Sequence, residues 1–96
     1  MTIIVSGHLF VAPEQRDDYL AARLPIMAHA RDAEGCADFA LTADPLVPGR
    51  INVYERWRTR EDLLAYRAGE GPEIVEDIPL TGVDVELHHI SASEAP

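Results

Sequence analysis

Residues 36–57, CADFALTADPLVPGRINVYERW, decide the fold. Polar and apolar side chains alternate along Cys36–Ala43 and again along Ile51–Trp57, the pattern of strands with one buried face. The intervening Asp44–Gly49 contains an aspartate, two prolines and a glycine, which are turn-forming residues. The stretch therefore predicts a hairpin of two strands. Its expected buried side carries Phe39, Leu41, Ile51, Val53 and Trp57.

A strand and a helix are expected before the hairpin. Residues 3–11 are largely apolar and β-branched, which predicts a strand. Pro13 suits the first turn of a helix, because its missing N–H has no intrahelical partner there. The helical pattern runs to about Ala33 with an expected kink at Pro25, and we predict that Gly35 ends the helix in a left-handed conformation.

A second helix and a last strand are expected after the hairpin. Residues 59–62, Thr-Arg-Glu-Asp, resemble a capping box at a helix start, and Gly69 is expected to stop that helix. The segment 70–81 is rich in Gly and Pro and predicts a mobile flap, in which residues 72–77 are candidates for a short helical turn. Alternation along Val83–Ile90 predicts the fourth strand.

The order of these elements predicts the fold class. It corresponds to the α+β, ferredoxin-like βαββαβ arrangement, a four-stranded antiparallel sheet with two helices on one face. The opposite face mixes apolar and polar side chains and needs a cover, which a second copy of the chain would supply. We expect His8 on that face to hydrogen-bond Asp84 or Glu86 of the last strand. A homodimer is the predicted assembly.

Length and composition limit the class of protein. The 96 residues suffice for a single domain spanning 1–96, and 47% hydrophobic with 26% charged residues is a globular composition. No apolar run approaches the roughly 20 residues that cross a bilayer, so we expect no membrane span. The N-terminal residues lack the features of a secretory signal, which leads us to expect a cytoplasmic protein.

Charge and residue usage argue against several kinds of chemistry. A net charge of −9, with arginines spread from Arg16 to Arg67, argues against a nucleic-acid partner. The absence of lysine excludes a lysine Schiff base and a lysine-bound pyridoxal cofactor. Cys36 is the only cysteine, so the chain forms no internal disulfide. No Gly-rich phosphate loop, Ser-His-Asp set or HExxH motif is present, and we expect no metal, haem or flavin.

Several short motifs are spread over nearly the whole chain. They are Ile3-Ile4-Val5, Glu34-Gly35-Cys36, and Tyr54-Glu55-Arg56-Trp57 followed by Glu61 and Leu63. Together they resemble the antibiotic biosynthesis monooxygenase family. The resemblance implies a dimeric α/β barrel.

The family resemblance also implies an activity. Some members oxidise aromatic polyketides or quinols without metal or flavin, so we expect a cofactor-independent monooxygenase that uses molecular oxygen on a small phenol, hydroquinone or polyketide aromatic. Haem-degrading members carry a first-strand Asn, which here falls near Gly7, and a His after the second helix, whereas residues 58–87 contain none. Cofactor-free members have an Asn four residues before the Trp, where this chain has Val53. The alternative is a non-catalytic dimeric module that binds a small hydrophobic ligand.

Trp57, Tyr66 and His29 are the candidate catalytic residues. By resemblance, Trp57 lies beside a pocket between the sheet and the helices, where a flat substrate would stack; the alternative is a core aromatic. Tyr66 would hydrogen-bond a substrate oxygen or, alternatively, pack on the sheet. His29 would act as a base, because histidine is the side chain that ordinarily titrates near neutral pH, or remain a solvated surface histidine.

Arg23, Met27, Leu63 and His89 are the candidate substrate-binding residues of the same pocket. Arg23 would hold an anionic group or extend past the sheet edge into solvent. Met27 and Leu63 belong to the apolar faces of the two helices, and His89 shares the inner side of the last strand. The segment 70–81 is expected to act as a lid.

Overall fold

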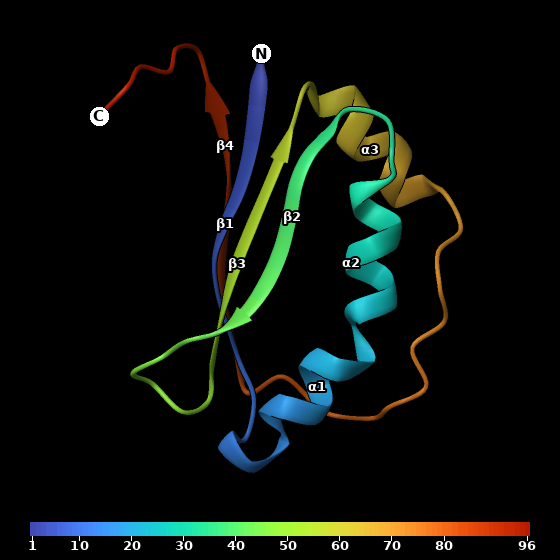
Figure 1. The fold of residues 1–96 in the computed structure, drawn as a ribbon, viewed down its shortest axis with the longest axis vertical. Coiled ribbons are helices and arrows are strands. Elements are labelled where there is room, and N and C mark those ends of the chain that lie inside the picture. The colour runs from blue at the N-terminus through green and yellow to red at the C-terminus, as the bar shows by residue number, and fades with distance from the viewer.

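The computed structural model describes all residues, 1–96, and contains one four-stranded antiparallel sheet with the spatial order β2-β3-β1-β4. The strands are β1 (Thr2–Phe10), β2 (Cys36–Ala43), β3 (Arg50–Trp57) and β4 (Gly82–Ile90). The helices lie on one side of the sheet, and the other side is open (Figure 1). They are α1 (Arg16–Ala22), α2 (Leu24–Arg31) and α3 (Arg60–Ala68). The predicted ferredoxin-like class is confirmed, and no helix is long and apolar enough to span a membrane.

The first predicted helix is divided into three pieces. A 3-10 turn at Pro13–Gln15 precedes α1, and α1 and α2 meet at Arg23, whose φ and ψ are −100° and 0°. Pro25 causes the break, because it has no N–H to donate and its ring displaces the preceding turn. The kink is confirmed, but the expected single helix is wrong, because the chain leaves the helical conformation at Arg23 and forms two helices, the second of which ends at Arg31.

The β2–β3 loop is held by one buried carboxylate. Asp44 Oδ2 accepts hydrogen bonds from the backbone N–H groups of Leu46 and Val47, at 3.0 and 2.8 Å. Its Oδ1 accepts from Asn52 Nδ2 and Arg50 Nη2, at 3.0 and 2.9 Å. The bond from Asn52 and the three others hold the pKa of Asp44 well below its usual range. The predicted hairpin turn is therefore fixed from its first residue.

The open side of the sheet carries the mixture of apolar and polar side chains that the sequence predicts. His8 is the register partner of Asn52 on β3 and of Asp84 on β4. Its Nδ1 lies 3.0 Å from Asn52 Oδ1, so the expected hydrogen bond to Asp84 or Glu86 is wrong. The Asn52 amide N–H group is directed at Asp44, which leaves its carbonyl oxygen facing His8.

The main core lies between the sheet and helices α2 and α3. Trp57 and Leu63 are completely enclosed, at 0% exposure, and Ile3 is 1% exposed. The remaining buried members of this cluster are Val5, Met27, Ala30 and Phe39. A smaller cluster of Val11, Tyr19 and Ile51 lies in the α1 region.

The segment between α3 and β4 has no regular secondary structure, so the helical turn considered for residues 72–77 is absent. Arg23 attaches this segment to α1 by an ion pair with Glu76. The same guanidinium donates to the Tyr19 carbonyl oxygen at 3.1 Å, and its carbon lies 3.3 Å from the centre of the Tyr19 ring. Glu76 also accepts from the N–H of Ile78 at 2.6 Å. One arginine therefore links the segment to the helix layer.

Two glycines have backbone conformations that other residues rarely adopt. Gly35 has φ of 80°, which confirms the left-handed position expected before β2. Gly7, inside β1, has φ of 144°, and a Cβ atom there would lie 2.0 Å from the carbonyl oxygen of Asp84. The pairing of β1 with β4 therefore requires glycine at position 7.

Gly7→Ala should lower the free energy of unfolding by about 1–3 kcal/mol, the usual cost of a sparsely populated backbone conformation. The new methyl group would in addition push β4 away from β1. Urea denaturation measures the change against Ser6→Ala, where the backbone has no positive φ. Equal unfolding midpoints for the two variants would contradict the prediction.

Candidate functional site

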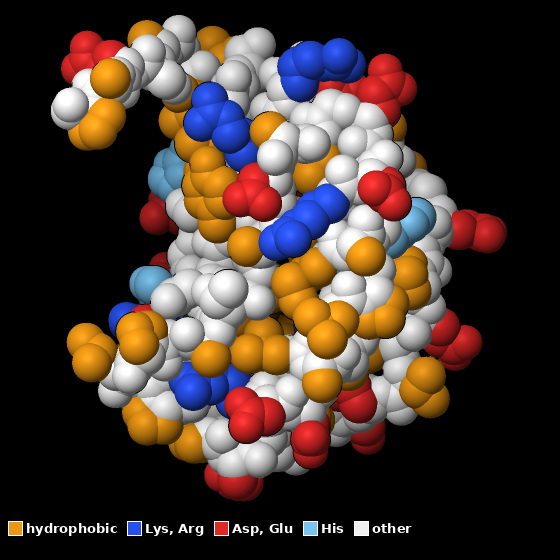
Figure 2. All heavy atoms as spheres, in the orientation of Figure 1, with side chains coloured by type: hydrophobic (Ala, Val, Ile, Leu, Met, Phe, Trp, Pro, Cys, Tyr) orange, Lys and Arg blue, Asp and Glu red, His pale blue; other side chains and the backbone are white.

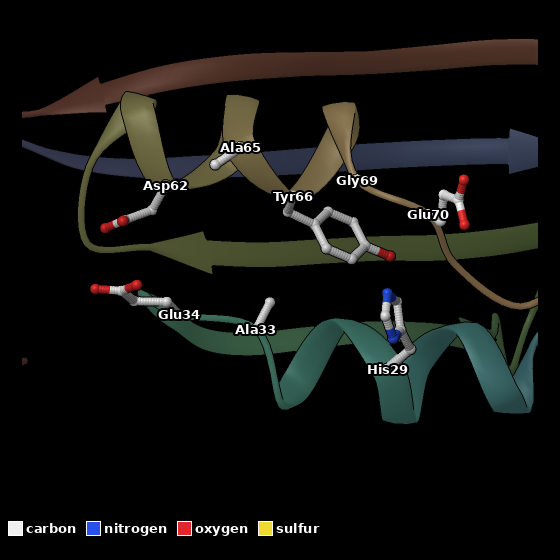
Figure 3. A pocket seen from close by; sticks show the side chains of 8 residues that line it. All are labelled: His29, Ala33, Glu34, Asp62, Ala65, Tyr66, Gly69 and Glu70. Carbon is white, nitrogen blue, oxygen red and sulfur yellow. The ribbon is translucent and has the colours of Figure 1, made fainter.

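A cleft of about 290 Å³ opens between α2 and α3. Figure 3 shows that it lies over β3, with Tyr66 reaching across from α3 and His29 rising from α2 toward the phenol oxygen. The volume is close to the lower end of the usual range for small-molecule sites. Its lining, which defines the α2–α3 cleft, is His29, Ala33, Glu34, Asp62, Ala65, Tyr66, Gly69 and Glu70.

Tyr66 joins the cleft to the core. Its ring centre lies 5.7 Å from that of His29, 5.2 Å from that of Trp57 and 6.2 Å from that of Phe39. Burial, and secondarily the charge of Glu55, raise the pKa of the Tyr66 hydroxyl above its ordinary value. The hydroxyl therefore stays protonated near neutral pH and is available as a hydrogen-bond donor.

Trp57 lies beneath Tyr66 and does not line the cleft. It is 0% exposed, and its indole Nε1 donates to Glu55 Oε1 at 3.0 Å. The predicted location on the helix side of the sheet is confirmed. In this conformation a ligand in the cleft would touch Tyr66 before it touched Trp57.

Glu55 is the residue that the sequence analysis overlooked. It stands between Val53 and Trp57 on the inner face of β3, with Val5 and Phe39 as its register partners. Burial raises the pKa of its carboxyl, although the hydrogen bond from Trp57 acts in the opposite direction. Strict alternation along β3 is the signal that would have found it, because a glutamate at this phase must enter the helix side.

The other predicted site residues lie apart from the cleft lining. Met27 and Leu63 are buried in the main core, at 9% and 0% exposure. Arg23 is engaged with Glu76 and Tyr19, so its predicted extension into solvent is wrong. His89 is exposed on β4, on the far side of β1 from β3.

The mouth of the cleft is acidic. Glu34, Asp62 and Glu70 belong to its lining, and Arg58 pairs with the first two at 3.6 and 3.1 Å. Asp62 also donates its backbone N–H to Thr59 Oγ1 at 3.1 Å, which confirms the predicted helix cap. With a net charge of −9 on the whole chain, this mouth disfavours anionic ligands. No group of three or more His, Cys, Asp or Glu side chains is placed to hold a metal ion.

The fold and the cleft define a ferredoxin-like α+β domain with aromatic side chains beneath a small, acidic-rimmed opening. The family model for antibiotic biosynthesis monooxygenase matches residues 2–71. The chain therefore belongs to the antibiotic biosynthesis monooxygenase family.

Solved structures of similar proteins share this fold. One is a proposed antibiotic biosynthesis monooxygenase from Deinococcus radiodurans, with a TM-score of 0.76 and 15% identity over 99% of this chain and 97% of that one. PA3566 from Pseudomonas aeruginosa has a TM-score of 0.72 and 18% identity, covering 95% and 94%. Rv0793 from Mycobacterium tuberculosis has a TM-score of 0.67 and 19% identity, covering 99% and 100%. No protein with a curated function matches the sequence.

Glu55→Gln should stabilise the protein at neutral pH. A carboxyl whose pKa is raised on folding favours the folded state at low pH, and that contribution is lost as the pH rises through the folded-state pKa. Glutamine keeps an oxygen for the Trp57 N–H and carries no charge. Thermal unfolding should give a higher Tm for the variant at pH 7, with the gap closing toward about pH 4.

The matched control is Glu73→Gln, which removes an exposed carboxylate elsewhere. A Tm difference for Glu55→Gln that does not change with pH would show that the carboxylate is not destabilised by burial.

Proposed function

We propose that the protein is a cofactor-independent monooxygenase that oxidises a small phenol, hydroquinone or polyketide aromatic with molecular oxygen. Membership of the family supports an oxygenase role. The observation that carries the proposal is the row of rings from His29 through Tyr66 to Trp57, with centres 5.7 and 5.2 Å apart, leading from the cleft toward the sheet. A flat substrate would stack on Tyr66 and His29, the two members of this row that line the cleft.

The substrate supplies all the electrons of this reaction. A hydroquinone loses a proton, and its anion gives one electron to O2. The resulting semiquinone and superoxide combine into a ring hydroperoxide. Loss of water leaves a hydroxyquinone, so that hydroquinone and O2 give hydroxyquinone and H2O. The protein contributes binding of the ring, exclusion of water and stabilisation of the anion.

Two side chains of the cleft suit parts of this reaction. Tyr66, kept protonated by its raised pKa, would donate a hydrogen bond to the anionic oxygen of the substrate. His29 is exposed at the mouth with its ring directed toward Tyr66, where it would pass protons to solvent (Figure 3). An acidic mouth is compatible with a substrate that enters uncharged.

A second function is favoured by one observation. Trp57 is 0% exposed and lies behind Tyr66, so the cleft offers a ligand only the rings of Tyr66 and His29. A non-catalytic dimeric module that binds a small hydrophobic ligand needs no more than this. The two proposals differ in whether oxygen is consumed.

Tyr66→Phe and Trp57→Phe should each slow oxygen consumption with a panel of hydroquinones by several-fold or more. A lost hydrogen bond and an altered aromatic contact each amount to about 1 kcal/mol. An oxygen electrode gives the rates, and circular dichroism checks folding. Leu64→Ala, which changes an exposed side chain of the same helix, is the control.

Unchanged rates in both folded aromatic variants would refute the assignment of the site. Absence of oxygen consumption by the native protein across the panel, with a hydroquinone still bound, would favour the binding module.

We further propose that the protein is a homodimer joined through the open side of the sheet. The C-terminal tail and the β2–β3 loop project beyond this side and leave a hollow between them in Figure 2. Leu46 on the loop is 87% exposed and Tyr54 on β3 is 36% exposed. Apolar side chains on an uncovered sheet face favour burial against a second copy.

Tyr54→Asp should shift the dimer toward monomer, because a charge would be buried at the centre of the proposed interface. Sedimentation velocity at micromolar concentration measures the shift. A native protein that sediments as a 10.6 kDa monomer under these conditions would refute the dimer.

A further inference from the structure

Glu55 is a carboxylate placed in apolar surroundings with few hydrogen bonds. Its register partners on the inner face of the sheet are Val5 and Phe39, which are 4% and 7% exposed. Oε1 accepts from Trp57 Nε1 at 3.0 Å, while Oε2 accepts no hydrogen bond from the protein. An ionised carboxylate has about four acceptor positions, so most of the capacity of Glu55 is unused.

Glu55 lies next to two residues on which Tyr66, a member of the cleft lining, packs. The ring of Tyr66 packs on Phe39 and on Trp57, and these two residues flank Glu55 across and along the sheet. Tyr66 therefore covers the part of the inner face from which the Glu55 side chain rises. Figure 3 places this ring in the cleft, above β3. Glu55 is not itself part of the cleft lining, but it lies close enough to Tyr66 for its charge to raise the pKa of the Tyr66 hydroxyl.

Burial raises the pKa of Glu55 above its ordinary value, and the charged groups around it modify that shift. The positive charge of Arg67 on α3 lowers the pKa of Glu55, but by less than burial raises it. Tyr66 from α3 and Cys36 from β2 are the neighbouring acids, and the Glu55 charge raises the pKa of both. From α2, the facing group is His29, across the Tyr66 ring. A carboxyl with a raised pKa is a stronger proton acceptor than an ordinary one.

We propose that Glu55 binds the hydroxyl group of the aromatic substrate through Oε2 and takes its proton. The O–H bond of the substrate breaks, the proton goes to Oε2, and the electron pair stays on the phenolate oxygen that then reduces O2. The Trp57 N–H holds Oε1, which leaves Oε2 free to accept a hydrogen bond from a ligand. This inference rests on the proposed oxygenase function for its chemistry, but the binding step can be tested separately.

Binding of phenol, compared with anisole, tests the hydroxyl contact without any oxidation. Anisole has the same ring and lacks the hydroxyl hydrogen. With the native protein, the affinity for phenol should fall by about tenfold as the pH is lowered from 8 to 4, because a charged acceptor is lost when Glu55 is protonated. The affinity for anisole should not show this fall. Isothermal titration calorimetry measures both.

Glu55→Gln should remove the pH dependence of phenol binding, and Glu73→Gln should retain it. The glutamine side chain still offers an oxygen to the Trp57 N–H, and circular dichroism with Tm checks that the variant is folded. In oxygen-consumption assays, Glu55→Gln should be strongly impaired at neutral pH and recover as the pH approaches the pKa of the hydroquinone, where solvent supplies the anion.

The outcomes separate the two proposals. Phenol affinity that is flat with pH in the native protein, persistence of the dependence in folded Glu55→Gln, or no phenol binding at all would overturn the role of Glu55. The predicted phenol binding without oxygen consumption by the native protein would support Glu55 as the hydroxyl-binding group and overturn the oxygenase function.

Discussion

The burial of the Trp57 indole joins the sheet to the helix layer, beneath the Tyr66 ring that lines the cleft. Its register partners are Ile3 on β1 and Cys36 on β2, so three strands meet at this ring, and Tyr66 covers it from α3. An indole has one polar atom, which needs an acceptor when it is enclosed by apolar side chains. Glu55 supplies that acceptor. The largest side chain of the core therefore brings a carboxylate into the helix side of the sheet.

Glu55 combines a favourable and an unfavourable contribution to stability at one position. The Glu55 carboxylate satisfies Trp57 yet is itself poorly solvated, and its raised pKa expresses the cost of keeping it charged. An apolar residue at position 55 would pack well against Val5 and Phe39 but would leave the indole N–H without a partner. A poorly solvated glutamate on the inner face of a sheet conflicts with the preference of such positions for apolar residues, and conflicts of this kind are found at functional sites.

The open side of the sheet has a different character, because its polar groups are fixed to one another. Asp44 directs the amide of Asn52, and Asn52 in turn holds Nδ1 of His8, so a line of hydrogen bonds crosses from the hairpin loop to β1. Because these polar groups are held in fixed directions, a partner surface can meet their remaining hydrogen-bonding capacity in only a few docking orientations. In the proposed homodimer, apolar side chains such as Tyr54 would provide the gain from burial, while this fixed line of polar groups would restrict how two copies dock.

The sequence by itself determined the four strands, the hairpin, the break caused by Pro25 and the left-handed Gly35, because each depends on neighbours within a few residues. Strand alternation was also sufficient to place Trp57 on the helix side. Only the tertiary structure decided that Arg23 pairs with Glu76, 53 residues away, and that His8 bonds Asn52, 44 residues away. Local pattern fixes which face a side chain occupies, whereas its partner depends on how distant segments pack over that face. Glu55 illustrates both parts, because alternation assigns it to the inner face, whereas only the tertiary structure brings Tyr66 of α3 within reach of its charge.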